Sequence, residues 1–329
     1  MALEDAGKQI DHAFTRADLR GQSFENAFAG APSFLRRRYS KDFSGADLVI
    51  TGVPFDQAVT HRPGARFGPR AIREASLLQP FDAPYGWGYD PLTEMAIIDG
   101  GDLAFDYADV AAFPECLRAH IGAILDAGPG AGPGVLALGG DHFITLPILR
   151  AHAERYGPVA LIHFDAHSDS WTDDNPARID HGTFLYKALQ EGVIRPETTV
   201  SVGIRTDNPD THGVTIVDAP TLHRDGVEAA LCIIRGVVGA QPVYVSFDID
   251  ALDPAFAPGT GTPVWGGLAS WQAAALLRGL AGINLVGGDV VEVSPPHDHA
   301  GITAIAAAHV AVELICLYGW TRRQGDHQP

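Results

Sequence analysis

Short apolar runs rich in valine and isoleucine alternate with longer helical patterns from residue 46 onward. Continuous apolar runs are typical of strands buried on both faces, and helices between them indicate parallel strands joined by crossovers. Eight strands are predicted, at residues 46–52, 95–99, 134–138, 159–163, 199–203, 215–217, 242–247 and 283–291. The pattern therefore predicts a three-layer α/β/α fold with a mainly parallel eight-stranded sheet.

Helical patterns separate these runs, and several have recognisable start signals. They cover residues 69–77, 113–127, 145–156, 183–191, 226–238, 270–281 and 303–317. Pro69 suits the first position of its helix because its missing N–H would have no partner there. Ser270 and Thr303 are suitable N-cap residues.

The domain organisation follows from the same pattern. The glycine- and proline-rich segment 128–134 is short enough for an ordinary loop, so one domain is predicted at residues 46–320. Residues 1–45 lack a clear period and include the basic patch Arg36-Arg37-Arg38, and we expect an irregular N-terminal arm there. Residues 321–329 are expected to form a C-terminal tail.

The charge balance restricts the partners. The chain has 40 acidic and 23 basic residues and a formal net charge of −17, which argues against nucleic acid or an anionic membrane surface. A cationic small substrate would be attracted, although acidic excess is also an ordinary route to solubility. Three separated cysteines without a Cys-x-x-Cys pair fit a reducing compartment. We recognise neither a signal-peptide pattern nor a stretch of about 20 apolar residues in the sequence. We therefore expect a soluble cytoplasmic protein.

Three short clusters of potential metal ligands each follow an apolar run. They are Gly-Gly-Asp-His at 139–142, Asp-Ala-His-Ser-Asp at 165–169 and Asp-Ile-Asp at 248–250. In an open α/β sheet, ligands bind beyond the carboxyl ends of the strands, where loops from different strands converge. Alternate residues of an extended chain point to one side, so the members of each cluster are expected to face the same point.

The ligand types indicate a two-metal site. Four clustered carboxylates would repel one another and shift towards protonation, whereas two divalent cations would hold them ionised. Such metal pairs lie roughly 3.5–4 Å apart and activate water. The oxygen-rich set favours Mn²⁺ over Zn²⁺. Asp and His near strand ends also cap helices and bind loop amides, which is the alternative for any one cluster alone.

Three longer segments resemble the signature segments of the ureohydrolase family, the arginases and agmatinases. They read GGDHFITLP at 139–147, HFDAHSDS at 163–170 and SFDIDALDPAFAPGTGTP at 246–263. The similarity runs from about residue 47 to the C-terminal helix. The resemblance implies an arginase-like fold, a binuclear manganese centre and a homo-oligomer, either a trimer or a hexamer.

The resemblance also implies a ligand for each metal position. One Mn²⁺ would be held by His142, Asp165, Asp169 and Asp248. The other would be held by Asp165, His167, Asp248 and Asp250. Asp165 and Asp248 would then bridge the two ions, with a water in the remaining shared position.

Two further residues are implied to act on the substrate. The segment Asp-His-Gly-Thr at 180–183 resembles the agmatinase segment whose histidine is a proton shuttle, which makes His181 the candidate. Its ordinary pKa near 6.5 allows both protonation states. Glu292 ends an apolar run, and the resemblance implies that its carboxylate accepts hydrogen bonds from the substrate guanidinium. The alternatives are a loop histidine that caps the next helix and a structural salt bridge from Glu292 to an arginine.

Other motifs are interpreted as structural. The segment HRPGARFGP at 61–69 resembles the agmatinase branch, but its spacing matches no phosphate-binding loop, so a structural role is favoured. Arg205 is expected to support the site from behind or to form a structural ion pair. His163, two residues before Asp165, is expected to support the metal ligands, as residues behind metal ligands commonly do.

The reaction implied by the resemblance is the hydrolysis of agmatine to urea and putrescine, a step of polyamine biosynthesis. Asp165 would accept a proton during collapse of the intermediate, and His181 would donate one to the leaving amine. His-Asp-His at 297–299 departs from many agmatinases and is similar to guanidinobutyrase-like members, so 4-guanidinobutanoate is the competing substrate. Two alternatives from other functional classes are a catalytically inactive metal-binding or regulatory protein and a metal-dependent deacetylase.

Overall fold

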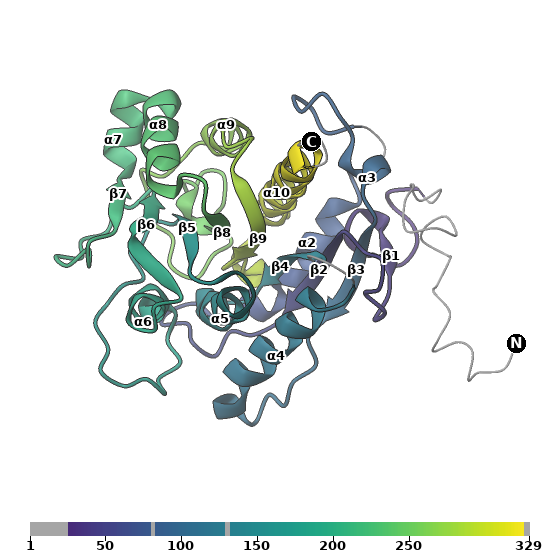
Figure 1. Cartoon of the computed structure of the whole chain (residues 1–329), viewed down its shortest axis with the longest axis horizontal. Coiled ribbons are helices and arrows are strands. Elements are labelled where there is room, and N and C mark those ends of the chain that lie inside the picture. The colour runs from purple at the N-terminus through teal and green to yellow at the C-terminus, as the bar shows by residue number, and fades with distance from the viewer. Residues whose placement is uncertain (1–25, 80–82, 129–131, 326–329) are drawn as a thin grey trace, which may run out of the picture.

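The computed structural model describes residues 26–79, 83–128 and 132–325. The first 25 residues of the predicted arm and the last four of the predicted tail lie outside these ranges. Figure 1 shows helices on both sides of one twisted sheet, which is the three-layer arrangement that the apolar pattern predicted. The division into an arm, one domain and a tail stays a prediction.

The described residues form a nine-stranded sheet in the order β1-β3-β2-β4-β9-β8-β5-β6-β7, and every neighbouring pair is parallel. The strands are β1 (Arg38–Tyr39), β2 (Leu48–Val53), β3 (Ile97–Asp102), β4 (Gly134–Gly139), β5 (Val159–Phe164), β6 (Ile194–Val202), β7 (Thr215–Val217), β8 (Pro242–Asp248) and β9 (Asn284–Val291). One more strand is present than was predicted. The additional strand is β1, whose two residues contain no apolar run.

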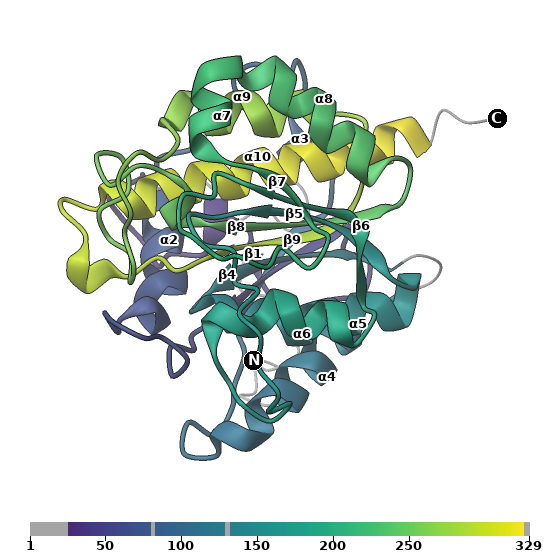
Figure 2. The ribbon, with the colours of Figure 1, turned by 90° about the vertical axis from the view of Figure 1, so that its left-hand side faces the viewer.

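Two helical layers cover the sheet, as the edge-on view in Figure 2 shows. One face carries α2 (Gly68–Ser76), α7 (Ala219–Asp225), α8 (Val227–Val238), α9 (Ser270–Gly279) and α10 (Ile302–Gly325). The other face carries α4 (Phe113–Leu125), α5 (Thr145–Tyr156) and α6 (Phe184–Gln190). A short helix, α3 (Pro91–Glu94), precedes β3. Single turns of 3₁₀ helix are η1 (Phe34–Arg36), η2 (Ala65–Phe67), η3 (Val110–Ala112), η4 (His142–Ile144), η5 (His181–Thr183), η6 (Ile249–Ala251) and η7 (Pro295–His297).

Alternation along the strands explains the two cores. In β4, Leu136 and Leu138 belong to the core under α10, whereas Val135 and Ala137 belong to the core under α4 and α5. Because neighbouring side chains of a strand point to opposite faces, a strand covered on both sides must be apolar at every position. This requirement produces the continuous apolar runs from which the sheet was predicted.

The helix α10 is the longest in the described part of the chain and lies in the core. Its segment Ile302–Arg323 is long and apolar enough to cross a membrane by length and composition, but 72% of its most apolar window is buried inside the protein. The expectation that no apolar stretch of this length exists was therefore wrong. The burial is that of a core helix. The predicted domain boundary at residue 320 falls inside α10.

Part of the predicted N-terminal arm packs against the sheet edge. The backbone N–H of Phe34 donates to Asp99 Oδ2 at 2.7 Å, and that of Leu35 donates to Ser76 Oγ at 2.8 Å. Asp99 is also paired with the Arg73 guanidinium at 2.8 Å. Phe34 and Leu35 are buried, so residues that lacked a period in the sequence are nevertheless part of the core.

Candidate metal centre

The predicted metal ligands and the predicted substrate-binding Glu292 lie at the ends of four strands that are consecutive in the sheet, namely β4, β9, β8 and β5. His142 lies in η4 after β4, Asp165 follows β5, Asp248 ends β8, and Glu292 follows β9. Because these strands are parallel, their carboxyl ends meet at one edge. The sheet order thereby brings together residues as far apart in the chain as His142 and Glu292, whose separation is 150 positions.

Four predicted ligands converge on one point and form what we call the first ligand group. His142 Nδ1 lies 3.0 Å from Asp165 Oδ2, 3.1 Å from Asp169 Oδ2 and 3.1 Å from Asp248 Oδ2. All four residues are buried. One imidazole nitrogen and three carboxylate oxygens facing one another are ligands suited to a divalent cation of the Mn²⁺ type.

A second ligand group lies beside the first and consists of Asp165, His167 and Asp250. His167 Nδ1 is 3.2 Å from Asp165 Oδ1 and 3.1 Å from Asp250 Oδ2. Asp165 therefore presents one oxygen to each group, which is the position that a bridging ligand requires. The second oxygen of Asp248 accepts the backbone N–H of Asp250 at 2.7 Å, so bridging by Asp248 stays a prediction.

Tight turns after the strands aim these side chains. Asp165 Oδ1 accepts the backbone N–H of His167 at 2.6 Å, which is the turn that short aspartate side chains favour. Asp169 has a left-handed backbone, with φ of 47°, so it reaches the cluster through a turn and not through the extended alternation that the sequence suggested. Glu292 is left-handed too, with φ of 62°. Such non-glycine residues cost energy and cluster at functional sites.

The glycine pair before His142 has a packing reason. A Cβ on Gly140 would lie 2.5 Å from the carbonyl oxygens of Val53 and Phe55, closer than real Cβ atoms approach. Glycine therefore allows the end of β4 to pass directly beside the loop that follows β2. The backbone N–H of Ala58 in that loop donates to Asp141 Oδ2 at 3.0 Å, which fixes the loop against the ligand segment.

Polar residues behind His142 orient its ring. Its Nε2 lies 2.8 Å from Ser246 Oγ, and this hydroxyl donates to Asp289 Oδ1 at 2.7 Å. Since the serine oxygen then accepts from the Nε2–H, Nδ1 keeps its lone pair for the cluster. Burial raises the pKa of Asp289 although the hydroxyls of Ser246 and Tyr244 oppose the rise. Sequence analysis missed Ser246 and Asp289, although Ser246 is two residues before Asp248 and so points to the same face of β8.

His163 supports Asp165 from the strand, in the position that the sequence suggested. Its Nε2 lies 2.9 Å from Asp165 Oδ2, and its Nδ1 lies 3.0 Å from Ser201 Oγ on β6. The imidazole therefore holds the same oxygen of Asp165 that faces His142 Nδ1.

The electrostatics of the cluster fit divalent cations. Burial, together with the charges of Asp250 and Asp165, raises the pKa of Asp248 well above its ordinary range. Burial and the charge of Asp165 likewise raise the pKa of Asp250. Buried carboxylates in contact need strong positive charge to stay ionised, and divalent cations supply it. The residues present therefore fit a metal pair.

His181 and Glu292 form a contact beside the ligand groups. Glu292 Oε1 lies 3.0 Å from His181 Nδ1 and accepts the backbone N–H of His142 at 2.9 Å. Glu292 Oε2 is buried and has no hydrogen-bond partner within the described ranges. Among those residues Glu292 forms no ion pair with an arginine, so the structural salt bridge considered above is not what the structure contains. Burial lowers the pKa of His181, but Glu292, Asp169 and Asp141 outweigh it and raise this pKa to about 9.

A cavity of about 330 Å³ opens onto these side chains. Its wall includes one histidine of a ligand group, two carboxylates of the first ligand group, the candidate shuttle, a tryptophan and a threonine: His167, Asp169, Asp248, His181, Trp171 and Thr60. The wall is about as polar as it is apolar. A small polar molecule in this cavity would touch both the ligand groups and His181.

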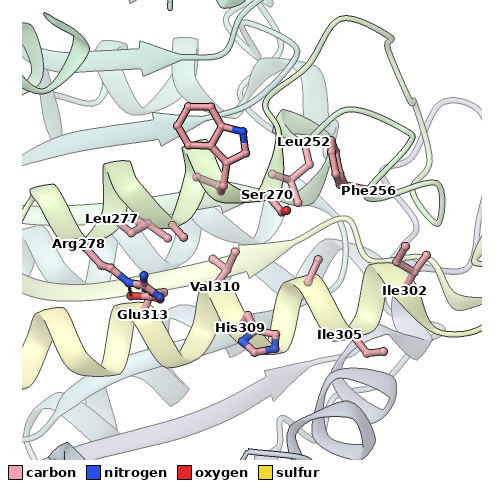
Figure 3. A pocket seen from close by; sticks show the side chains of 14 residues that line it. Leu252, Phe256, Ser270, Leu277, Arg278, Ile302, Ile305, His309, Val310 and Glu313 are labelled. Carbon is pink, nitrogen blue, oxygen red and sulfur yellow. Dashed lines mark hydrogen bonds and ion pairs between the residues drawn. The ribbon is translucent and has the colours of Figure 1, made fainter. Parts of the chain in front are cut away.

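A larger cavity of about 440 Å³ lies elsewhere, between α9 and α10. Figure 3 shows its wall, in which aliphatic side chains such as Val310 and Leu277 face the space and the Arg278–Glu313 ion pair lies at one end. Its wall contains neither ligand group. The smaller, polar cavity is therefore the candidate site.

The structural interpretation of the segment 61–69 agrees with its contacts. Asp56 accepts the backbone N–H of Gly64 at 2.8 Å and pairs with the Arg66 guanidinium. Gly64 has φ of 136°, and a Cβ there would lie 2.6 Å from Ser294 Oγ, so the glycine is required by both conformation and space. The segment is a loop that is held by Asp56 and packs on the residues that follow β9.

The contacts of Arg205 differ from the structural ion pair that was considered from the sequence. Its Nη2 donates to the backbone carbonyls of Asp250 and Val264, both at 2.6 Å. The guanidinium thus satisfies carbonyl oxygens of the loop after β8 in place of a carboxylate. It holds the backbone that carries Asp250, and burial lowers its pKa.

A parallel α/β/α fold with two adjoining ligand groups at the carboxyl edge defines a metal-dependent hydrolase of the arginase type. The Arginase family model matches residues 46–316, and the chain belongs to this family of binuclear metal hydrolases. The predicted family and fold are confirmed.

Similar proteins narrow the group within the family. The chain is 49% identical to an agmatinase of Chromobacterium violaceum, over 93% of this chain and 94% of that protein. It is 48% identical to an agmatinase of Neisseria meningitidis, over 92% and 97%. A crystal structure of a hypothetical agmatinase from Burkholderia thailandensis superposes with a TM-score of 0.92 at 51% identity, over 96% and 98%. Proclavaminate amidino hydrolase from Streptomyces clavuligerus superposes with a TM-score of 0.85 at 39% identity, over 90% and 100%.

Proposed function

We propose that the chain is an agmatinase, which hydrolyses the guanidinium group of agmatine to urea and putrescine with two Mn²⁺ ions. One observation carries the proposal. Residues of both ligand groups line one small polar cavity together with His181, which also contacts Glu292. Relatives that are themselves agmatinases, at 44–49% identity, support agmatine as the substrate.

The metal ions would be held by six side chains, which are His142, Asp165, His167, Asp169, Asp248 and Asp250. When bound, the two metal ions would supply Lewis acidity and activate water for attack on the guanidinium carbon. Mn²⁺ is favoured over Zn²⁺ because four of the six ligands are carboxylates. Asp165 is proposed to accept a proton as the tetrahedral carbon collapses, since each of its oxygens faces one ligand group.

Glu292 is proposed to bind the substrate guanidinium. Its Oε1 is occupied by His142 and His181, whereas Oε2 is buried without a partner and so has the capacity to accept hydrogen bonds. A charge-assisted contact of this kind would orient the guanidinium plane. The left-handed backbone of Glu292 is the cost of aiming its carboxylate into the site.

His181 is proposed to protonate the leaving amine. When the bond between the guanidinium carbon and the alkyl nitrogen breaks, the electron pair stays on that nitrogen and a proton must reach it. Burial lowers the pKa of His181, but Glu292, Asp169 and Asp141 outweigh it and raise this pKa to about 9, which favours the protonated imidazole near neutral pH. A protonated imidazole in the cavity wall meets the requirement for a general acid.

A second candidate substrate is 4-guanidinobutanoate, and one observation favours it. Arg178 lines the cavity with its side chain 57% exposed, and although its Nε lies 3.8 Å from Asp173 Oδ2, its guanidinium could attract a carboxylate tail. The residues at 297–299 give less support than the sequence suggested. Asp298 accepts the hydroxyl of Thr303 and backbone N–H groups at the start of α10, and His297 contacts the Pro63 carbonyl. These contacts are structural.

Urea release from three compounds tests the proposal. The full-length protein is loaded with Mn²⁺ and assayed with agmatine, 4-guanidinobutanoate and arginine at matched concentrations. Agmatine is expected to have the highest kcat/KM. A clear preference for 4-guanidinobutanoate would transfer the assignment to guanidinobutyrase, and no urea from any of the three would refute a ureohydrolase.

We also propose that the protein works in the cytoplasm as a homo-oligomer. The three cysteines Cys116, Cys232 and Cys316 are free, as is usual in a reducing compartment. The trimer or hexamer implied by the family resemblance is tested by light scattering of the Mn²⁺-loaded protein, and a monomeric mass would contradict it.

A further inference from the structure

The hydroxyl of Thr60 is the cavity-side partner of His181. Thr60 Oγ1 lies 3.0 Å from His181 Nε2, while His181 Nδ1 faces Glu292 Oε1 at the same distance. Thr60 and His181 are both in the wall of the small cavity. His181 and Glu292 are buried, whereas Thr60 is exposed to the cavity. On its Nε2 side the imidazole therefore faces the Thr60 hydroxyl, and both residues line the cavity.

The hydrogen-bond types assign a role to each ring nitrogen. An ionised carboxylate only accepts, so Nδ1 carries a hydrogen and donates to Glu292. The nitrogen that exchanges its proton during a reaction is then Nε2. A hydroxyl can donate to a bare Nε2 or accept from a protonated one, and Thr60 can serve both states without moving.

The loop that carries Thr60 is fixed on both sides. Ala58, two residues earlier, donates its N–H to Asp141 Oδ2 at 3.0 Å, and its carbonyl accepts the N–H of His181 at 3.5 Å. Four residues later, Gly64 donates to Asp56 at 2.8 Å. The position of the Thr60 hydroxyl relative to His181 is thus set by the loop and not by chance contact of a free side chain.

We propose that Thr60 relays the proton from His181 to the leaving amine, an inference that rests on the proposed function. In this step Nε2–H is transferred to Thr60 Oγ1 while the hydroxyl hydrogen passes to the leaving nitrogen. The carbon–nitrogen bond breaks, and its electron pair forms the new N–H bond. The hydroxyl gains one proton and loses one, and His181 ends neutral with its hydrogen on Nδ1.

Thr60→Val and Thr60→Ser separate the hydroxyl from the shape of the side chain. Valine has the shape of threonine without the hydroxyl, and serine retains the hydroxyl. In the Mn²⁺-loaded full-length protein, Thr60→Val is expected to lower kcat for agmatine about 10²-fold, because a positioned proton donor contributes this much. KM should stay within about twofold, since the hydroxyl acts in the transition state. Thr60→Ser should restore most of kcat.

A second measurement does not depend on turnover. Diethyl pyrocarbonate acylates unprotonated imidazole nitrogens, and mass spectrometry of the digested protein follows His181, with the exposed His299 as the internal reference. Because the Thr60 hydroxyl hydrogen-bonds Nε2 whereas valine of the same shape does not, the modification of His181 should be several-fold faster in Thr60→Val and unchanged in Thr60→Ser, when it is measured near pH 9, where part of this imidazole is unprotonated. Both variants should bind as much manganese as the wild type.

The outcomes distinguish this inference from the proposed function. If the wild type releases no urea from any guanidino compound, the proposed function fails and the relay fails with it, whatever the modification rates. If the wild type is active but Thr60→Val retains its kcat, the relay alone is wrong. A loss of kcat that serine does not restore, or that comes with unchanged modification of His181, would also overturn the relay. Loss and rescue together with faster modification support it.

Discussion

The imidazoles of the two ligand groups lie in different surroundings. The side chain of His142 in the first ligand group is 0% exposed and packs against the ring of Phe184, with 4.4 Å between ring centroids. The side chain of His167 in the second ligand group is 26% exposed and lies in the cavity wall. A cation in the first group would be held by enclosed, prepositioned ligands, whereas one in the second would border solvent. We therefore expect tighter binding and slower exchange in the first group.

The largest effect on metal binding and activity is expected when Asp165, which faces both ligand groups, is substituted. Asp165→Ala removes an oxygen from both groups, so both ions should be lost. Loss of several kcal/mol of Lewis-acid stabilisation corresponds to a fall in kcat of at least about 10³-fold. Metal analysis and urea release measure the two effects. The exposed Asp174 gives the matched control, and Asp174→Ala should keep both ions and full activity. Retention of two ions by Asp165→Ala would refute its shared position.

The two histidines test the difference between the groups directly. His167→Ala should leave about one Mn²⁺ per chain, since the enclosed first group remains complete. His142→Ala should lose the first-group ion and also weaken retention in the second, because Asp165 then loses one of its partners. Both variants should lose most activity. Metal content after dialysis measures the result, and equal losses in the two variants would contradict the proposed order of affinity.

The sequence indicated the candidate ligands but not the residues that support them. The six predicted ligands follow apolar runs at short spacings, and both signals are local in the chain. The roles of Ser246 and Asp289 depend on β8 being the neighbour of β9, and the role of Thr60 depends on the β2 loop reaching η5. Such neighbours are set by the sheet order, which the pattern of apolar runs does not contain.

The prediction of the fold from the sequence has the same limit. Long apolar runs identified eight strands, and Thr215–Val217 has the same bounds in sequence and structure. The strand β1 was missed because pairing with β3, and not an apolar pattern, makes Arg38 and Tyr39 a strand. The helix α7 was missed, although Asp218 as its N-cap and the proline that follows were available signals.

Substitution of the residues behind His142 should weaken metal binding in the first ligand group more than in the second. Ser246→Ala removes the hydroxyl that accepts from His142 Nε2 and donates to Asp289. Residues of this kind contribute about 10- to 100-fold to metal affinity, so the tighter of two Mn²⁺ dissociation constants should rise by that factor. Ser201→Ala, behind His163, is the matched comparison. If Ser246→Ala weakened only the looser ion, the assignment of the tighter constant to the first group would be wrong.

The smallest expected effect concerns Asp169, the first-group ligand with a left-handed backbone. Asn208 Nδ2 donates to Ser168 Oγ at 2.8 Å and to Ser170 Oγ at 3.2 Å, so it holds the residues on both sides of Asp169. Asn208→Ala should let this strained segment relax and should speed release of the tighter ion several-fold, within the cost of about 1–3 kcal/mol that such a conformation carries. Chelator-induced metal release measures the rate. Asn175→Ala, in the exposed loop that follows, is the control. If only the faster phase of release changed in Asn208→Ala, Asp169 would belong functionally with the second group, and the difference between the two groups would have to be redrawn.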